Sequence, residues 1–139
     1  MTDQPQPPYG TAAWRDLTVE NAADLRDFYT AVAGWTAIPV SMGDYDDFDM
    51  RDQSGRSVAG ICHAKGSNAK MPPQWLVYVM VEDTSLAAQA AIEKGGQILD
   101  GPRDMGGGRM CVVKDPAGAV IALFEPQMEN TDEMAPMSD

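Results

Sequence analysis

Alternating apolar and polar positions occur twice along the chain, each time followed by a segment with helical periodicity. The first alternating run covers residues 14–21 (WRDLTVEN) and the second covers residues 76–83 (LVYVMVED). Alternation of this kind predicts strands with one buried face. The segments that follow, residues 22–33 and residues 85–94, place apolar side chains at helical spacing. The pattern therefore predicts two strand–helix pairs.

Polar residues and glycines mark the expected ends of both helices. Asn21 precedes the first helix and Asp83 or Thr84 precedes the second, and these residue types are favoured as N-caps. Gly34 ends the first helix and the pair Gly95-Gly96 ends the second, because glycine adopts the left-handed cap conformation without a steric penalty.

Equivalent positions in the two halves are separated by an almost constant distance. Val19 and Val81 are 62 residues apart, and so are Gly34 and Gly96. Three shorter strands are expected after each helix, over residues 36–42, 48–52 and 56–64 in the first half and 97–101, 109–114 and 119–125 in the second. The last two strands of each half are joined by a turn that begins with Asp and ends with Gly, as type I turns prefer. The turn glycines are 63 residues apart. We interpret the chain as two βαβββ modules.

The predicted fold class is α+β, with both modules in a single domain over residues 12–127. Module 1 covers about residues 12–70 and module 2 about residues 71–127. Residues 1–11, rich in Pro and Gln, are expected to form a flexible tail, and residues 128–139 a disordered acidic tail.

The composition restricts the partners of this domain. The chain has 139 residues, 44% of them hydrophobic, and a formal net charge of −11. This much apolar material supports a core, whereas the negative charge argues against nucleic acid and anionic membranes as partners. No apolar stretch reaches the roughly 20 residues of a membrane helix, and no signal peptide is recognisable, so a cytoplasmic location is expected. The two cysteines lie in apolar runs and are expected to be structural thiols.

Two segments carry a resemblance to a known family. Residues 24–35 (DLRDFYTAVAGW) and residues 114–118 (KDPAG) resemble the vicinal oxygen chelate superfamily of glyoxalase I, bleomycin-resistance proteins and extradiol dioxygenases, over roughly residues 13–126. The resemblance implies a cupped mixed sheet around a central cleft, which holds a divalent metal or a small molecule, and it implies a homodimer.

In the metal-binding members the ligands come from the first and last strands of each module. The matching positions here are Trp14, Ala59, Leu76 and Ala122, and none of these side chains offers a lone pair to a metal. A shift of one residue would substitute Gly60 or Leu123, which are no better. No cofactor is therefore expected, although a divalent metal at a displaced site that uses His63 and Asp16 stays open.

His63 is the only imidazole in the chain. With Ala59 facing the cleft, strand alternation places His63 on the same side. Three interpretations remain: a solvated residue at the rim, a substrate contact or proton acceptor, and a metal ligand.

Strand alternation also predicts the wall of the cleft, which is mainly aromatic and soft apolar, as small-molecule pockets usually are. The predicted cleft residues are Trp14, Asp16, Thr18, Ile61, His63, Tyr78, Met80, Met110 and Phe124. In an alternative interpretation, the aromatic rings fill the cleft by packing against one another.

These observations favour a bleomycin-resistance-like protein that binds a small, partly aromatic or cationic molecule without a metal. One alternative is a metal-dependent lyase, similar to lactoylglutathione lyase, or a dioxygenase with a displaced metal site. The other is a non-catalytic structural or regulatory protein with a filled cleft. No catalytic residue is assigned, because one histidine without a nucleophile beside it forms no recognisable constellation.

Overall fold

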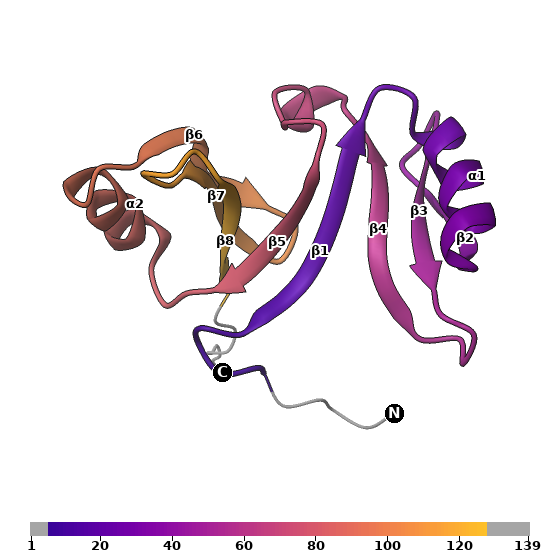
Figure 1. The fold of residues 1–139 in the computed structure, drawn as a ribbon, viewed down its shortest axis with the longest axis horizontal. Coiled ribbons are helices and arrows are strands. Elements are labelled where there is room, and N and C mark those ends of the chain that lie inside the picture. Colours follow the sequence, from indigo (N-terminus) through magenta and orange to yellow (C-terminus); the bar gives the residue numbers. More distant parts are fainter. Residues whose placement is uncertain (1–5, 128–139) are drawn as a thin grey trace, which may run out of the picture. The chain divides into compact units, whose positions relative to one another are not determined.

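The computed structural model describes residues 6–127, which fold into two βαβββ series (Figure 1). This confirms the predicted α+β class and the internal repeat. The predicted disordered tail at residues 128–139 and residues 1–5 of the predicted N-terminal tail lie outside the described residues. The elements are β1 (Ala12–Val19), α1 (Ala22–Ala33), β2 (Thr36–Ser41), β3 (Asp46–Arg51), β4 (Ser57–His63), the short 3-10 helix η1 (Gly66–Asn68), β5 (Trp75–Met80), α2 (Thr84–Glu93), β6 (Gln97–Met105), β7 (Gly108–Lys114) and β8 (Val120–Pro126).

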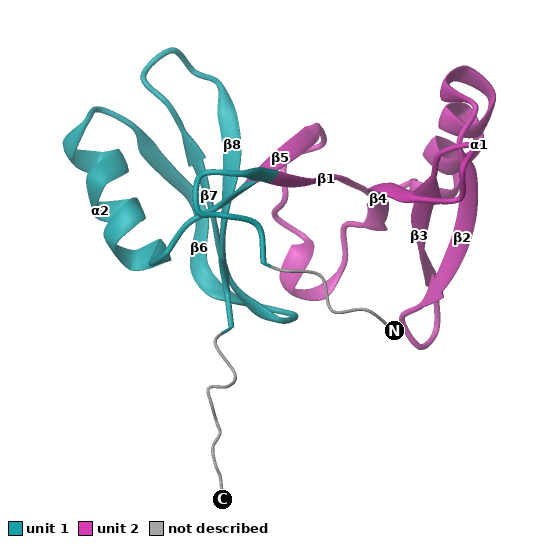
Figure 2. Ribbon diagram, turned by 90° about the horizontal axis from the view of Figure 1, so that it is seen from below, with its two compact units in different colours: residues 1–12, 79–139 teal, residues 13–78 magenta. Residues whose placement is uncertain are grey.

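The chain divides into two compact units (Figure 2). Residues 13–78 form one unit, and residues 79–127 form the other together with residues 6–12. The boundary therefore lies within β5. Two residues of the predicted N-terminal tail join the second unit, since the Gly10 amide donates to the Met80 carbonyl (2.7 Å) and the Met80 amide donates to Thr11 (2.9 Å).

In the unit of residues 13–78 the strands lie in the order β2-β3-β4-β1. β1 and β4 are parallel and the other pairs are antiparallel, so the sheet is mixed. Helix α1 contacts β2 and β4 (Figure 1). The core on this side contains buried side chains from β1, β3 and β4, with α1 residues packed against them: Leu17, Phe48, Met50, Ala59 and Ile61.

In the other unit the antiparallel strands lie in the order β8-β7-β6, the counterpart of β4-β3-β2. Helix α2 packs through Ala88 against Cys111 and Val113 of β7, and the partly buried Leu123 of β8 joins this cluster. Residues on the other side of these strands are fully buried as well: Met110, Val112 and Ala122.

The helix ends follow the predicted residues with one exception. Gly34 ends α1 in the left-handed conformation, with a φ of 73°. Asp83 caps α2 by accepting the Leu86 amide at 3.0 Å. Asn21 occupies the equivalent position before α1, yet its side chain makes no capping hydrogen bond. The predicted N-cap position of Asn21 is confirmed, but the side-chain cap is missing, because the Asn21 backbone (φ −106°, ψ 54°) departs from the extended conformation that Asp83 adopts.

A register shift in β4 reverses the predicted orientation of its side chains. Met50 pairs with Ala59 but Arg51 pairs with Ser57, so Val58 is an additional residue in β4. One extra residue moves every following side chain to the other face. The prediction that Ile61 lines the cleft, with Ala59 at a ligand position, is wrong, since both pack in the core with α1.

Within residues 6–127, no helix combines the length and the apolar character that crossing a membrane requires.

Candidate functional site

Acidic side chains gather on the side of β1, β3 and β4 that faces away from α1. We define the acidic face as Trp14, Asp16, Asp47, Asp49 and Cys62. Its strands are held in register by the pairs Asp16–Gly60 and Asp49–Gly60. β1 contributes alternate residues, so Thr18 lies on this side too, beyond Asp16.

The Asp16 carboxylate lies beside the Trp14 indole and above the backbone of Gly60. Trp14 Nε1–H donates to Asp16 Oδ1 at 2.8 Å. A β-carbon at position 60 would overlap with Oδ1 of Asp16, and it would lie 3.7 Å from Trp14 Nε1. Glycine at position 60 therefore provides the space that the carboxylate occupies.

Burial raises the pKa of the Asp16 carboxyl group. The hydrogen bond from Trp14 lowers this pKa in part, and the negative charge of Asp47 raises it further. The carboxylate is thus partly removed from water, and within residues 6–127 no basic side chain forms an ion pair with it, which makes it responsive to a cation.

Asp47 joins β3 to the end of β4. The residue is 8% exposed, and Oδ1 accepts the backbone N–H of His63 at 2.8 Å. Cys62 interacts with the same carboxylate. Burial is the largest cause that raises the pKa of the Cys62 thiol, followed by the charges of Asp16 and Asp47. Cys62 therefore remains protonated near neutral pH and does not act as a nucleophile there.

His63 lies at the end of β4, between Asp47 and the core residue Phe48. Its Nδ1 is 3.3 Å from Asp47 Oδ1, and its ring centroid is 5.2 Å from that of Tyr45 and 6.4 Å from that of Phe48. Its side chain is 16% exposed. Most of the His63 side chain is therefore packed against its neighbours rather than surrounded by water.

The other predicted cleft residues are mostly buried. Tyr78 is 4% exposed and Met80 6%. Met110 and Phe124 are partners in the β7–β8 register and face away from α2. The structure thus groups Trp14, Asp16 and Thr18 in one unit, and Met110 and Phe124 in the other.

Trp75 has a structural role. Its Nε1–H donates to the Tyr29 hydroxyl at 3.0 Å, and its ring meets those of Tyr29 and Trp35 edge to face, with centroids 5.2 and 5.7 Å away. These rings pack against the α1 core. Trp14 is the tryptophan of the acidic face.

Asp47, Asp49, Gly60 and Cys62 were not among the predicted site residues. A signal for two of them was present, because the 62-residue offset of the strands relates Gly60 to Ala122 and Cys62 to Phe124. The turn glycines, 63 residues apart, gave a different alignment. The additional residue Val58 accounts for the difference.

The residues of this chain do not fit a family-type metal centre. With the register corrected, the four matching positions hold Trp14, Gly60, Leu76 and Ala122, which have no metal-donor side chains. Among residues 6–127, no group of three or more His, Cys, Asp or Glu side chains is arranged to hold a metal ion.

The fold and the repeat define a tandem βαβββ protein, and comparison with protein families agrees with them. The chain belongs to the Glyoxalase/Bleomycin resistance protein/Dioxygenase superfamily, whose model matches residues 11–123. It is 32% identical over 122 residues to the putative glyoxylase CFP32 of Mycobacterium tuberculosis, covering 84% of this chain and 46% of that protein. It is also 32% identical over 128 residues to the anthracycline biosynthesis protein DnrV of Streptomyces peucetius, covering 83% and 46%. The chain thus spans about half the length of these relatives.

Solved structures share the fold at low sequence identity. A structure described as NAD-dependent benzaldehyde dehydrogenase from Legionella pneumophila superposes with a TM-score of 0.52 at 17% identity, covering 82% of this chain and 98% of that one. A methylmalonyl-CoA epimerase from Streptomyces coelicolor gives 0.51 at 14% identity, covering 87% and 100%. These similarities concern the fold alone.

Proposed function

We propose that this chain binds a small, partly aromatic or cationic molecule at the acidic face, without a metal ion. The observation that carries the proposal is the partly buried Asp16 carboxylate, hydrogen-bonded to Trp14 and lying over Gly60. Membership of a family that includes bleomycin-resistance proteins supports a small-molecule ligand. The relative named as an anthracycline biosynthesis protein is consistent with it.

Electrostatics favour a cation at Asp16. Asp49 is neutralised by Arg51, whose Nε is 2.9 Å from its Oδ2, and Asp47 is occupied by His63. In the part of the chain that the structure describes, Asp16 has no basic partner of this kind, and the charged form of a partly buried carboxylate is costly until a countercharge arrives. The adjacent Trp14 ring would add stacking and cation–π attraction for an aromatic cation.

The test is a titration with N-methylacridinium, a permanent aromatic cation, and with neutral acridine at pH 8. Binding is followed by calorimetry and by tryptophan fluorescence. We expect Asp16→Asn to weaken N-methylacridinium binding by about tenfold or more, as for other charge-assisted contacts, and to leave acridine nearly unchanged. Trp14→Phe should remove most of the quenching, whereas Trp75→Phe should retain it.

Two results would contradict the proposal. One is the absence of binding at millimolar concentration for N-methylacridinium and for an anthracycline such as daunomycin. The other is equal affinity in the wild type and Asp16→Asn.

A second candidate is a non-catalytic protein in which side chains fill the face away from the helix. The complete burial of Met110, Val112 and Ala122 favours it for the second module. Failure of all probes to bind, together with a high melting temperature, would support this candidate.

The homodimer and the cytoplasmic location remain predictions, and so does the absence of a metal. Elemental analysis of protein purified without chelator tests the last of these, since stoichiometric Zn, Ni, Mn or Fe would favour a lyase or dioxygenase.

A further inference from the structure

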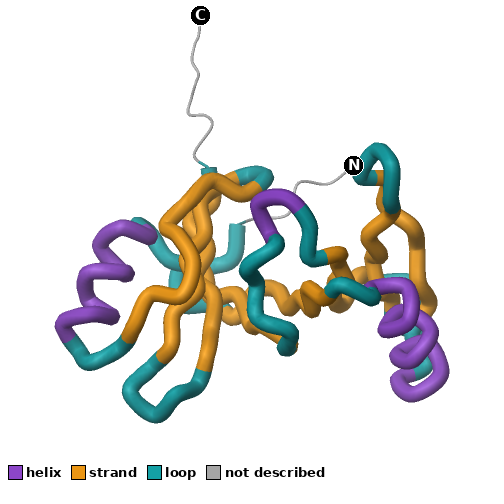
Figure 3. The backbone as a smooth tube through the Cα atoms, turned by 90° about the horizontal axis from the view of Figure 1, so that it is seen from above, coloured by secondary structure: helices purple, strands orange, loops and turns teal. Residues whose placement is uncertain are grey.

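A pocket of about 310 Å³ lies within the unit of residues 13–78, where β1 ends and α1 begins. Its polar lining comes from Thr18, Glu20 and Asn21, and part of its apolar lining from Met71 and Pro73. The last two belong to the loop between β4 and β5, which contains the short helix η1 (Figure 3). The volume suits a ligand of modest size.

Thr18 brings a hydroxyl group to this pocket. The residue is 4% exposed, and among the described residues its Oγ1 has no hydrogen-bond partner. An acceptor atom on a ligand in the pocket would supply the missing hydrogen bond.

Asn21 offers a second uncommitted polar group. Its side chain does not cap α1, whereas Asp83 caps α2. Within residues 6–127, the Asn21 amide has no hydrogen-bond partner. The 12-residue α1 also directs its N-terminal partial positive charge to this region. Thr18 and Asn21 therefore each bring a hydrogen-bond donor to the pocket.

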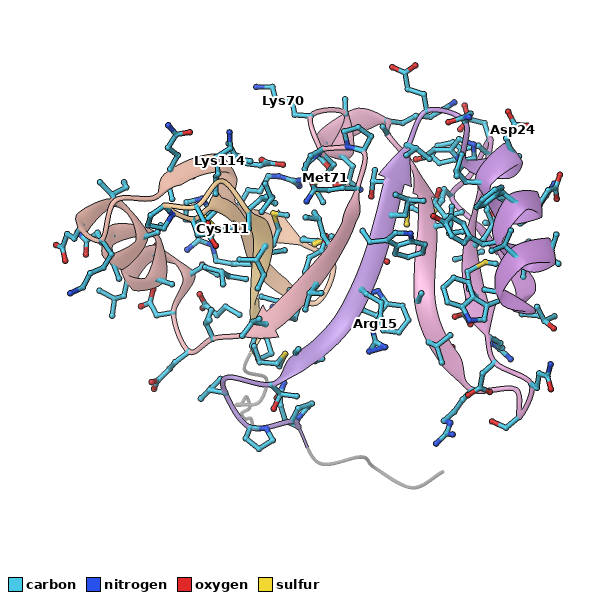
Figure 4. The ribbon with its side chains drawn as sticks, in the orientation of Figure 1. Arg15, Asp24, Lys70, Met71, Cys111 and Lys114 are labelled. Atoms are coloured by element: carbon cyan, nitrogen blue, oxygen red, sulfur yellow. The ribbon has the colours of Figure 1, made fainter. Side chains whose placement is uncertain are left out.

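The remaining wall is apolar. Met71 is 5% exposed, whereas the side chain of the neighbouring Lys70 points away from the ribbon (Figure 4). Methionine adapts its shape to different aliphatic groups. Glu20 lines the same pocket and the chain carries a net charge of −11, so an anionic ligand is disfavoured.

We propose that this pocket binds a neutral aliphatic molecule through its carbonyl group, as in a carboxamide or a ketone. The Thr18 hydroxyl and the Asn21 amide donate to the carbonyl oxygen, and Met71 contacts the aliphatic part. This site is independent of cation binding at Asp16.

The test uses three probes that share a cyclohexyl group: cyclohexanecarboxamide, cyclohexanecarboxylate and cyclohexylmethylammonium. Methyl resonances of Met, Thr and Ala report on binding to the full-length protein. We expect the carboxamide to shift the Met71 methyl resonance and to bind at least threefold more tightly than either ion.

Substitutions in the pocket separate the proposed contacts from general effects. Thr18→Val, which keeps the shape of the side chain, should lower the carboxamide affinity about threefold to tenfold, as expected for one hydrogen bond. Thr18→Ser should retain most of the affinity, and Thr30→Val on the exposed surface of α1 is the matched control. Ala64→Leu, which introduces a larger side chain into the lining, should abolish binding.

The proposal is overturned if cyclohexanecarboxamide causes no shift at 50 mM, if the carboxylate binds equally well, or if Thr18→Val and Ala64→Leu both match the wild type. N-methylacridinium binding is measured on the same samples. If Thr18→Val loses carboxamide binding but retains N-methylacridinium binding, the two sites are separate. If N-methylacridinium does not bind but the carboxamide does, only the proposed function is contradicted.

Discussion

The carboxylate of Asp16 occupies the space that a β-carbon at position 60 would fill. The two residues are paired across the parallel strands β1 and β4, so neither can move away without disturbing the register. The space for the Asp16 side chain on β1 therefore depends on the absence of a side chain at Gly60 on β4.

Gly60→Ala should destabilise the protein by about 1–3 kcal/mol, as overpacking typically does, and should weaken binding of N-methylacridinium. The new methyl group displaces the Asp16 carboxylate and strains its hydrogen bond with Trp14. Urea unfolding at neutral pH measures the loss of stability.

Two controls accompany this substitution. Gly106→Ala introduces the same methyl group where no atom lies within 4 Å, and it should change stability far less. In an Asp16→Ala background, Gly60→Ala should be nearly neutral. A full cost of Gly60→Ala in that background would show that the Asp16 contact is not its cause.

Asp16→Asn should raise the melting temperature at pH 7. Burial raises the pKa of Asp16 in the folded protein above its unfolded value of about 3.8. The folded state therefore holds this proton more tightly, and the associated stability is present below the unfolded pKa and lost as the pH rises through the folded pKa. Asparagine avoids that loss and still accepts the Trp14 hydrogen bond. Calorimetry from pH 3.5 to 7 should show a difference that grows with pH, and a pH-independent difference contradicts the explanation.

Asp83→Ala should destabilise the protein by about 1 kcal/mol, the usual effect of removing an N-cap. The Asp83 carboxylate accepts the Leu86 amide, which would lose its partner. Asn21→Ala is the matched comparison and should cost less than about 0.5 kcal/mol, because Asn21 makes no capping hydrogen bond. Equal losses for the two variants in urea unfolding would disagree with these roles.

Tyr29→Phe should cost about 1 kcal/mol, because it leaves the Trp75 indole N–H without its acceptor. The effect should largely disappear in a Trp75→Phe background, where no donor remains. A double-mutant cycle by chemical denaturation measures this coupling. A coupling energy near zero would assign the cost of Tyr29→Phe to packing with Trp35 instead.

Cys62 and Cys111 should react slowly with iodoacetamide in the folded protein. Burial raises the pKa of both thiols, and Cys111 is fully buried. Free glutathione in the same sample serves as the reference thiol. At pH 7.5, mass spectrometry should find both cysteines unmodified when glutathione has fully reacted, and both modified in 6 M urea. Rapid labelling of Cys62 under native conditions would show that the acidic face opens.

The elements of the fold follow local patterns, which explains why they could be predicted. Alternation located β1 and β5, and Gly34 marked the end of α1 with its positive φ. The orientation of β4 depended on Val58, whose displacement from the ladder follows from how β3 pairs with β4. No pattern within β4 alone records that pairing.

The site could be predicted only where it depends on β1. Trp14, Asp16 and Thr18 follow strict alternation. Asp47 lies in an acidic segment that looks like an exposed loop in the sequence. In the structure its carboxylate contacts the His63 backbone N–H and the Cys62 side chain, and both belong to β4, which is distant in the sequence.

Val58 also has a consequence for how the two modules diverged. Between the turn glycine and the equivalent positions Gly60 and Ala122 in the last strands, the first module has one residue more than the second, although the helix and the first strand keep the same spacing. Insertion or deletion of a single codon at this position would turn the side chains of β4 from one face of the sheet to the other. Residues that packed against the helix would then face the ligand, and the reverse, while β4 keeps the same two neighbouring strands. One such event can replace several ligand-facing side chains at once, which point substitutions could achieve only through many steps.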